Sequence, residues 1–261
     1  MIRADLYLVN FGFARSRESA RRSIEACLVK IDGKLINKPS EKIDDSFEHN
    51  VVFQNSIPYV GRGGLKLEAA LDAFKIDPCG KVCIDIGAST GGFTDCMLQN
   101  GATKVFSVDV GYGQLAWKLR QDERVVNMER TNIRYVTPED IDFASIDVSF
   151  ISLKLVLPVA YNLLGENGEL VALIKPQFEA GREQVGKKGV VRDINVHYSV
   201  ISTVLDFARS INFYVSGLSY SPIKGPEGNI EYLAYLTKQS AEDIYTQEYI
   251  KNVVDKSHEV L

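Results

Sequence analysis

Residues 81–95 read Lys-Val-Cys-Ile-Asp-Ile-Gly-Ala-Ser-Thr-Gly-Gly-Phe-Thr-Asp, which is an apolar strand, a glycine-rich turn and the start of a helix. Gly87 and Gly91 allow a ligand to approach the backbone closely, and Gly92 suits a tight entry into the helix. Asp85 stands near the carboxyl end of the strand, where it can accept a hydrogen bond from a ligand's amino group. The stretch contains neither GxGxxG nor GxxxxGK followed by Ser or Thr, which weakens a nicotinamide or triphosphate interpretation. It predicts a ligand-binding turn in an α/β fold.

Extended and helical patterns alternate on both sides of this turn. The expected strands are residues 81–86, 104–110, 125–129, 145–148, 169–175, 213–222 and 231–237. The expected helices around them are residues 65–74, 93–99, 114–121, 153–164 and 196–211. Such alternation predicts an α/β, Rossmann-like sheet of seven strands with helices on both faces. Because only residues 223–230 join the last two strands, a crossover helix cannot fit, and these strands should pair antiparallel.

The N-terminal residues form a separate, small α+β pattern. A first helix ends near Gly12, Ser16 can cap a second helix, and an Asp-Gly turn predicts a hairpin that a strand at 51–53 completes. Residues 1–38 carry eight lysines and arginines against four acidic residues. This order of elements resembles the alpha-L RNA-binding domain. The resemblance implies RNA contacts by Arg15, Arg17, Arg21, Arg22 and Lys30.

Size and composition indicate an ordinary globular protein with more than one domain. The 261 residues are 45% hydrophobic and 25% charged, and a net charge of −4 still permits a local basic face. We expect a domain at 1–57, a linker at 58–63, a second domain at 64–240 and a helical tail at 241–261.

Cysteine spacing and hydropathy further limit the kind of protein that this chain can be. The four cysteines form no CxxC pair, so free thiols are expected rather than a zinc site or disulfides. The sequence shows no signal peptide and no run of about 18 apolar residues. We therefore expect a cytoplasmic protein without a membrane span.

Four charged side chains stand where strands and a helix of the predicted sheet begin or end. Asp147 and Lys175 each close an apolar strand, Glu231 begins the last strand, and Lys66 opens the helix after the linker. Carboxyl ends of parallel strands meet at the ligand crevice of such a sheet. A lysine after four apolar residues is costly to bury unless it is paired. The sequence therefore predicts a catalytic cluster of these residues, in preference to a merely structural set of ion pairs.

The chain as a whole resembles the TlyA family, whose members carry the name hemolysin but are similar to FtsJ-type rRNA ribose methyltransferases. The segments that carry this resemblance are GRGGLKLEAAL, DIGASTGGFTD, VDVGYGQLAWKLR, ERTNIR, DVSFIS, LIKPQFE, GVVRD and GPEGNIEY. One departure is Tyr59-Val60, which stands where the family can carry a tryptophan.

The resemblance implies a function and a set of site residues. It implies S-adenosylmethionine as cofactor, S-adenosylhomocysteine as product, no metal, and cytidine 2′-hydroxyls of ribosomal RNA, within one or both ribosomal subunits, as substrate. The implied catalytic tetrad is Lys66, Asp147, Lys175 and Glu231. The implied cofactor-binding residues are Asp85, Gly87, Ser89, Gly91, Gly92, Asp109, Glu129 and Asn132. The residue types agree, since an acidic side chain at a strand end, here Asp109, can bind both ribose hydroxyls.

The expected chemistry is a single displacement in which the ribose oxygen attacks the methyl group. We hypothesise that neutral Lys175 removes the hydroxyl proton, while Lys66 and Glu231 position Lys175 and the ribose. Arg182, Lys187 and Lys188 lie in a glycine-rich stretch that predicts a loop contacting RNA phosphates. Three alternatives stay open: a membrane-damaging hemolysin, a non-enzymatic RNA-binding module and a small-molecule methyltransferase. The first predicts an amphipathic or spanning segment that the sequence lacks.

Overall fold

The computed structural model describes residues 1–53, 58–137, 140–225, 227–239 and 245–261. Its contacts divide the chain into two compact units, Met1–Pro58 and Tyr59–Leu261, and each is described by itself. Residues 54–57 of the predicted first domain, Pro226 of the GPEGNIEY segment and residues 241–244 of the predicted tail lie outside the described residues.

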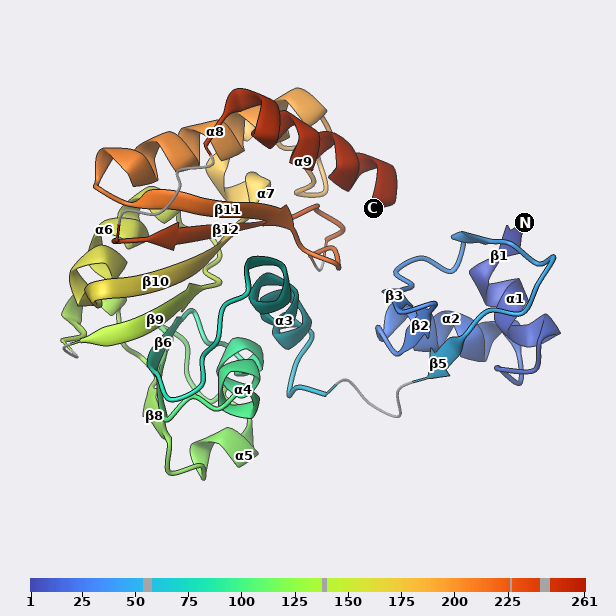
Figure 1. Ribbon diagram of the computed structural model, residues 1–261, viewed down its shortest axis with the longest axis horizontal. Helices are drawn as coiled ribbons and strands as arrows, with labels where there is room; N and C mark the ends of the chain where they lie inside the picture. Colours follow the sequence, from blue (N-terminus) through green and yellow to red (C-terminus); the bar gives the residue numbers. More distant parts are fainter. Residues whose placement is uncertain (54–57, 138–139, 226, 240–244) are drawn as a thin grey trace. The chain divides into compact units, whose positions relative to one another are not determined.

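The described residues of the first unit form two helices and two small sheets (Figure 1). Its helices are α1 (Ala4–Asn10) and α2 (Arg17–Glu25). Its strands are β1 (Ile2–Arg3), β2 (Val29–Ile31), β3 (Lys34–Leu35), β4 (Lys42–Ile43) and β5 (Val51–Phe53). As predicted, the Ser16 side chain caps α2 by accepting from the Ser19 amide, and β2 and β3 form the hairpin that β5 extends. The pairing of β1 with β4 has no counterpart in the prediction.

A compact apolar core holds this unit together. Tyr7, Leu8 and Ile24 are fully buried and pack with Val29 of the hairpin. Within α1 the buried residues Ala4, Tyr7 and Leu8 are three or four positions apart, as are Ala20 and Ile24 within α2, so each helix buries one apolar face.

The second unit is built on a mixed sheet of seven strands in the order β11-β12-β10-β9-β6-β7-β8. The strands are β6 (Val82–Ile86), β7 (Lys104–Val108), β8 (Val125–Met128), β9 (Ile141–Ile146), β10 (Leu164–Ile174), β11 (Tyr214–Tyr220) and β12 (Tyr232–Thr237). Neighbours from β8 to β10 pair parallel, whereas β12 is antiparallel to both β10 and β11. The predicted fold class and the antiparallel last strands are confirmed.

Helices cover both faces of this sheet (Figure 1). The longer helices are α3 (Gly63–Phe74), α4 (Gly92–Gln99), α6 (Leu153–Leu163), α8 (Ile194–Ser210) and α9 (Gln247–Val260). The short ones are α5 (Trp117–Arg120), α7 (Pro176–Glu179), and the 3-10 turns η1 (Ile133–Tyr135) and η2 (Arg182–Gln184). Helices α3 and α4 pack together, α6 contacts α8, and α9 packs on α8 and β11.

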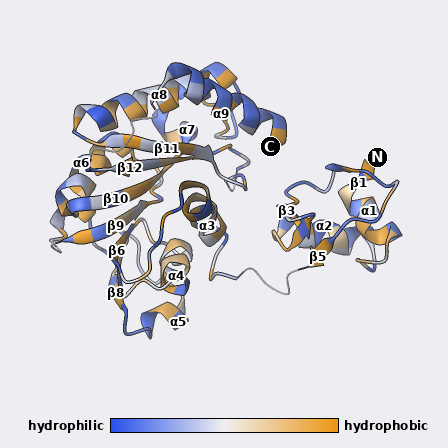
Figure 2. Cartoon of the chain, in the orientation of Figure 1, coloured by the Kyte–Doolittle hydropathy of each residue, from blue (hydrophilic) through white to orange (hydrophobic). Residues whose placement is uncertain are grey.

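The C-terminal helix is part of the second unit's core rather than a polar appendage. Ile250 and Val254 of α9 are buried and belong to the same apolar cluster as Ile201 and Leu205 of α8. Figure 2 shows hydrophobic and hydrophilic residues alternating along both helices, as expected of helices with one buried face. The predicted helical tail thus contributes α9, which packs on α8 and on the edge strand β11.

Candidate active site

The glycine-rich turn after β6 passes directly beside the end of β9. Gly87 has a φ of +90°, and a Cβ there would lie 2.6 Å from the carbonyl oxygen of Asp147. Both the left-handed conformation and the close approach exclude a larger side chain. Gly91 is the N-cap of α4 and Gly92 its first residue. The turn therefore brings the start of α4 and the Asp147 segment to one edge of the sheet.

Asp85 precedes this turn by two residues, near the end of β6. It is fully buried and accepts from the Thr94 amide at 2.9 Å, from the Thr94 hydroxyl at 2.7 Å and from the Ser145 hydroxyl at 3.1 Å. Burial raises the pKa of Asp85 to about 7, the Asp147 charge adds to this rise, and the Thr94 and Ser145 hydrogen bonds oppose it. The carboxylate ties α4 to β6 and β9, and it lines neither of the two cavities that follow.

A cavity of about 490 Å³ lies at the carboxyl ends of β6, β7 and β9. Gly87, Ser89, Asp109 and Asn132 line it, together with apolar side chains that include Val108. Asp109 and Asp147 are its acidic lining residues, and among the described residues no lysine or arginine lines it. We name it the larger cavity; its lining favours a ligand with an apolar part and a positive charge.

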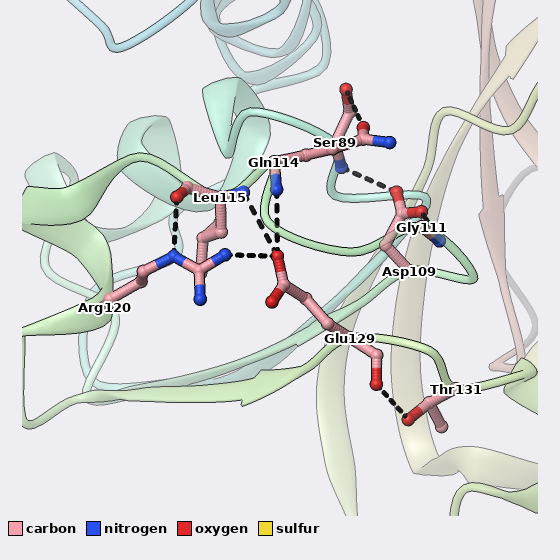
Figure 3. Close-up of polar contacts among 8 residues, drawn as sticks. All are labelled: Ser89, Asp109, Gly111, Gln114, Leu115, Arg120, Glu129 and Thr131. Atoms are coloured by element: carbon pink, nitrogen blue, oxygen red, sulfur yellow. Dashed lines mark hydrogen bonds and ion pairs between the residues drawn. The ribbon is translucent and has the colours of Figure 1, made fainter.

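A network of backbone amides organises the wall of the larger cavity (Figure 3). The Asp109 carboxylate accepts from the Ser89 amide at 2.7 Å and from the Gly111 amide at 2.6 Å. Each carboxylate oxygen has a second lone pair, so Asp109 can still accept hydroxyl groups of a ligand.

Glu129 supports the same wall from behind. Its carboxylate accepts from the Gln114 amide at 3.0 Å and pairs with Arg120. Burial opposes ionisation of Glu129, but the hydrogen bonds from Arg120 and from the Gln114 and Leu115 amides outweigh it and hold the pKa below its usual range. Glu129 is not among the residues that line the larger cavity, and its carboxylate supports the loop at Gln114 and Leu115.

A second cavity, of about 260 Å³ and named here the smaller cavity, contains all four residues of the predicted tetrad. Lys66 from α3 pairs with Glu231 at the start of β12, with 2.5 Å between Nζ and Oε2. Lys175 at the end of β10 pairs with Asp147 at the end of β9, with 2.5 Å between Nζ and Oδ1. The fold thus brings together side chains 165 positions apart in the chain.

Three of the four side chains in these pairs are buried, and Asp147 is partly exposed. Lys66 is 7%, Lys175 8% and Glu231 1% exposed. Lys175 also donates to the Ser149 hydroxyl at 3.1 Å. Removing charged groups from water costs several kcal/mol per ion, and pairing offsets that cost only in part. Clustering of such groups in a cavity is typical of a catalytic site.

The two cavities adjoin. Gly87, Ser89, Asp147 and Ser149 line both of them. A ligand in the larger cavity and a ligand in the smaller one would therefore meet at Asp147, beside the Lys175 amine. This arrangement suits transfer of a group from one bound molecule to another.

Several lining residues were not anticipated from the sequence. Arg62 and Lys224 line the smaller cavity, and Phe150 lines the larger one. Phe150 is 90% exposed with a φ of +64°, and its ring centroid lies 4.9 Å from that of Phe178. A polar residue or glycine is usual at such a backbone conformation. In the sequence, the available signal was the aromatic residue between DVS and IS, directly after the strand that ends at Asp147.

The predicted RNA-contacting cations have different surroundings in the first unit. Arg17 pairs with buried Asp5 at 2.9 Å, and a hydrogen bond from Arg3, followed by one from Arg17, lowers the pKa of Asp5 to about 2. Arg21 and Arg22 each face a glutamate of α2, whereas Arg15 is exposed and Lys30 half-buried on β2. Arg17 therefore holds α2 to α1 as well as facing solvent.

The predicted basic loop lies in the second unit between α7 and α8. Arg182, Lys187 and Lys188 are exposed. The loop is tethered at its end by buried Asn229, which accepts from the Val191 amide at 3.0 Å and donates to the Gly189 carbonyl at 2.8 Å. Within the described residues no helix is long and apolar enough to cross a membrane, and no group of three or more His, Cys, Asp or Glu is arranged to hold a metal.

Comparisons with known proteins agree with this architecture. Residues 59–238 match the family described as FtsJ-like methyltransferase, and residues 2–46 match the S4 domain. The chain is 52% identical to YqxC of Bacillus subtilis, named provisionally as an rRNA methyltransferase, with 99% of this chain and 95% of that protein aligned.

Two further relatives are similar over nearly the whole chain. The 16S/23S rRNA (cytidine-2′-O)-methyltransferase TlyA of Mycobacterium tuberculosis is 45% identical, over 91% of this chain and 90% of its own length. A solved structure from Streptococcus thermophilus, described provisionally as a hemolysin, is 48% identical with a TM-score of 0.76 and covers 99% of this chain and 96% of its own.

Proposed function

The chain belongs to the FtsJ-like methyltransferase family, and from that premise we propose that it transfers the methyl group of S-adenosylmethionine to a cytidine ribose 2′-hydroxyl of ribosomal RNA. The observation that carries this proposal is the meeting of two cavities at Asp147, beside the buried Lys175 amine. The larger cavity suits a cationic nucleoside, and the smaller cavity presents the Lys175 amine as a proton acceptor to a second ligand.

The larger cavity fits the cofactor in size, charge and polarity. A volume of about 490 Å³ is in the range of pockets that enclose small organic ligands. Its lining combines apolar side chains with Asp109, whose carboxylate can accept ribose hydroxyls, and with Asp147, which balances positive charge. S-adenosylmethionine supplies an electrophilic methyl group on a sulfonium cation, and S-adenosylhomocysteine is the product.

In the tetrad, Lys175 would act as the proton acceptor and the other three residues would position the reacting groups. Lys175 removes the 2′-hydroxyl proton as the oxygen accepts the methyl group, and this step needs the uncharged amine. A cation in the larger cavity would lie beside the Asp147 carboxylate, with which Lys175 also pairs. The Lys66–Glu231 pair fixes the opposite wall, and alignment of the two reactants supplies a large part of the rate.

The substrate class is proposed from the first unit together with the named relatives. An S4 domain matches residues 2–46, and relatives over most of the chain are named as rRNA (cytidine-2′-O)-methyltransferases. The exposed cations Arg15, Lys187 and Lys188 are available for RNA phosphates, so RNA affinity should weaken with added salt.

The first test is transfer of labelled methyl from S-adenosylmethionine to purified, unmodified small and large ribosomal subunits, assayed separately. We expect label on RNA, and we expect Lys175→Ala to lower kcat about 10²- to 10⁴-fold, the usual contribution of a general base. Lys154→Ala, which removes an exposed lysine of α6, is the matched control and should keep wild-type turnover.

Calorimetric measurement of the affinity for S-adenosylmethionine distinguishes a variant or substrate that fails in methyl transfer from a protein that fails to bind the cofactor. Lys175→Ala that keeps wild-type turnover would contradict the role of Lys175. Wild-type protein that binds S-adenosylmethionine but labels neither subunit would contradict the substrate.

A further inference from the structure

Ser149 lies where the two cavities meet and bonds directly to Lys175. Its hydroxyl oxygen accepts from Nζ of Lys175 at 3.1 Å, and its side chain lines both the larger and the smaller cavity. Asp147 approaches the same amine to 2.5 Å, but among the described residues its Oδ1 has no partner of hydrogen-bond geometry. The hydrogen bond that gives the Lys175 amine a direction is therefore the one with Ser149.

The segment that carries Ser149 is held in place on both sides. Before it, the Asp147 amide donates to the Ile86 carbonyl at 3.0 Å, which ties the segment to β6. After it, the Glu179 carboxylate of α7 accepts from the Leu153 amide at 2.7 Å, at the start of α6. The Ser149 side chain therefore starts from backbone whose position is fixed.

Lys175 and Glu179 belong to the same short stretch of chain. Lys175 is the N-cap of α7, and the Phe178 amide donates to the Lys175 carbonyl at 2.9 Å. The Phe178 ring lies against that of Phe150, the residue after Ser149, with 4.9 Å between the centroids. One helical turn thus carries the amine at one end and, at the other, the carboxylate that clamps the Ser149 segment. The fold itself keeps Ser149 beside Lys175.

We propose that Ser149 is a positioning residue that turns the lone pair of neutral Lys175 toward the ribose hydroxyl in the smaller cavity. This inference rests on the proposed function. A lysine ammonium has three N–H groups, and the neutral amine keeps two of them beside a lone pair. With one N–H donated to Ser149 and the other facing Asp147, the lone pair is left for the ribose. It takes up the hydroxyl proton while the ribose oxygen bonds to the methyl carbon, whose bond to sulfur breaks with both electrons left on sulfur.

The test compares Ser149→Thr, which keeps the hydroxyl, with Ser149→Val, which matches threonine in shape but lacks the hydroxyl. Methylation kinetics are measured with full-length protein and the ribosomal subunit that the wild type methylates. For Ser149→Val and Ser149→Ala we expect kcat to fall about tenfold, in the range of one lost hydrogen bond. KM for the subunit and calorimetric affinity for S-adenosylmethionine should not change, because the hydroxyl acts on Lys175. Ser149→Thr should keep most of the wild-type kcat.

A double variant separates positioning from a general structural effect. Ser149→Ala added to Lys175→Ala should slow single-turnover methylation no further than Lys175→Ala alone, because the effects of residues that act as one unit do not add. Ser210→Ala, which removes an exposed hydroxyl at the end of α8, is the matched control and should keep wild-type turnover.

Three results would overturn the role of Ser149. They are wild-type kcat in both Ser149→Ala and Ser149→Val, weakened binding of S-adenosylmethionine in place of a lower kcat, and losses that add in the double variant. A wild type that methylates neither subunit would instead refute the proposed function itself, and the role of Ser149 with it.

Discussion

At the scale of single residues, Glu231 is the most constrained member of the tetrad. It is 1% exposed and pairs with Lys66 at 2.5 Å, and the Gln177 amide lies 3.5 Å from its other oxygen. The backbone of Gly225 closes the remaining side. A carboxylate so enclosed cannot move to accommodate a change without breaking its pair with Lys66.

Gly225→Ala should therefore lower activity without unfolding the protein. The new Cβ would lie 2.4 Å from Oε1 of Glu231, so the carboxylate or the connection has to shift. Because a misplacement of about 1 Å can cost 10²-fold in rate, we expect kcat to fall about ten- to a hundredfold. Gly165→Ala, where a Cβ would meet its nearest atoms at an ordinary 3.8 Å, is the control. Unchanged kcat in Gly225→Ala would show that Glu231 does not need this position.

At the scale of elements, a buried polar junction joins α8, β12 and α9. The His197 Nδ1 lies 2.7 Å from the Tyr232 hydroxyl and 3.1 Å from His258 Nε2, and Tyr232 also contacts the Ser257 hydroxyl at 2.9 Å. Burial lowers the pKa of His197 to about 4, and the nearby His258 adds to this shift. Burial lowers the pKa of His258 as well. Both rings are therefore neutral in the folded protein near pH 7.

This junction predicts loss of stability in mild acid. The unfolded chain binds a proton at His197 with the ordinary pKa of about 6.5, whereas the folded unit does not until about pH 4. Stability is thus full above pH 6.5 and falls as the pH drops toward 4, by about 3 kcal/mol for this ring. Asp85 contributes in the opposite direction over the same range, because its folded pKa of about 7 lies above that of the unfolded chain. Urea unfolding of the second unit should therefore be compared between wild type and His197→Gln, and the wild type should lose about 3 kcal/mol relative to this variant as the pH drops from 6.5 toward 4. His49→Gln, in the first unit, should match the wild-type profile, and parallel profiles of wild type and His197→Gln would contradict the role of His197.

The elements also show how far the sequence could be read. The sheet was predictable because strand periodicity and short connections are local properties, and the β11–β12 pairing followed from connection length alone. Helix α5 is shorter than its pattern because the Gln114 and Leu115 amides donate to Glu129 instead of starting a helix. Side-chain direction was not readable from the sequence, so the hydrogen bonds of Asp85 with Thr94 and Ser145 were not anticipated. Lys224 was not anticipated as a lining residue of the smaller cavity, because it lies in a connection without a pattern of its own.

At the scale of the whole molecule, charge is distributed for two kinds of ligand. The chain carries a net charge of −4, so attraction for a polyanion has to be local. The first unit provides exposed cations such as Arg15, while Arg62 is among the residues that line the smaller cavity. Two weak sites on one chain reinforce each other, because binding at one raises the effective concentration at the other.

That reinforcement predicts the effect of removing residues 1–58. All lining residues of both cavities lie between Arg62 and Glu231, so the truncated protein should keep its affinity for S-adenosylmethionine and its kcat at saturating substrate. Its KM for the ribosomal subunit should rise about 10²-fold or more, because a second binding module contributes 10²- to 10⁴-fold in avidity. Steady-state methylation and calorimetry of both forms measure the two quantities. An unchanged KM would mean that the first unit does not contact the substrate, whereas lost cofactor binding would mean that residues 1–58 support the catalytic unit directly.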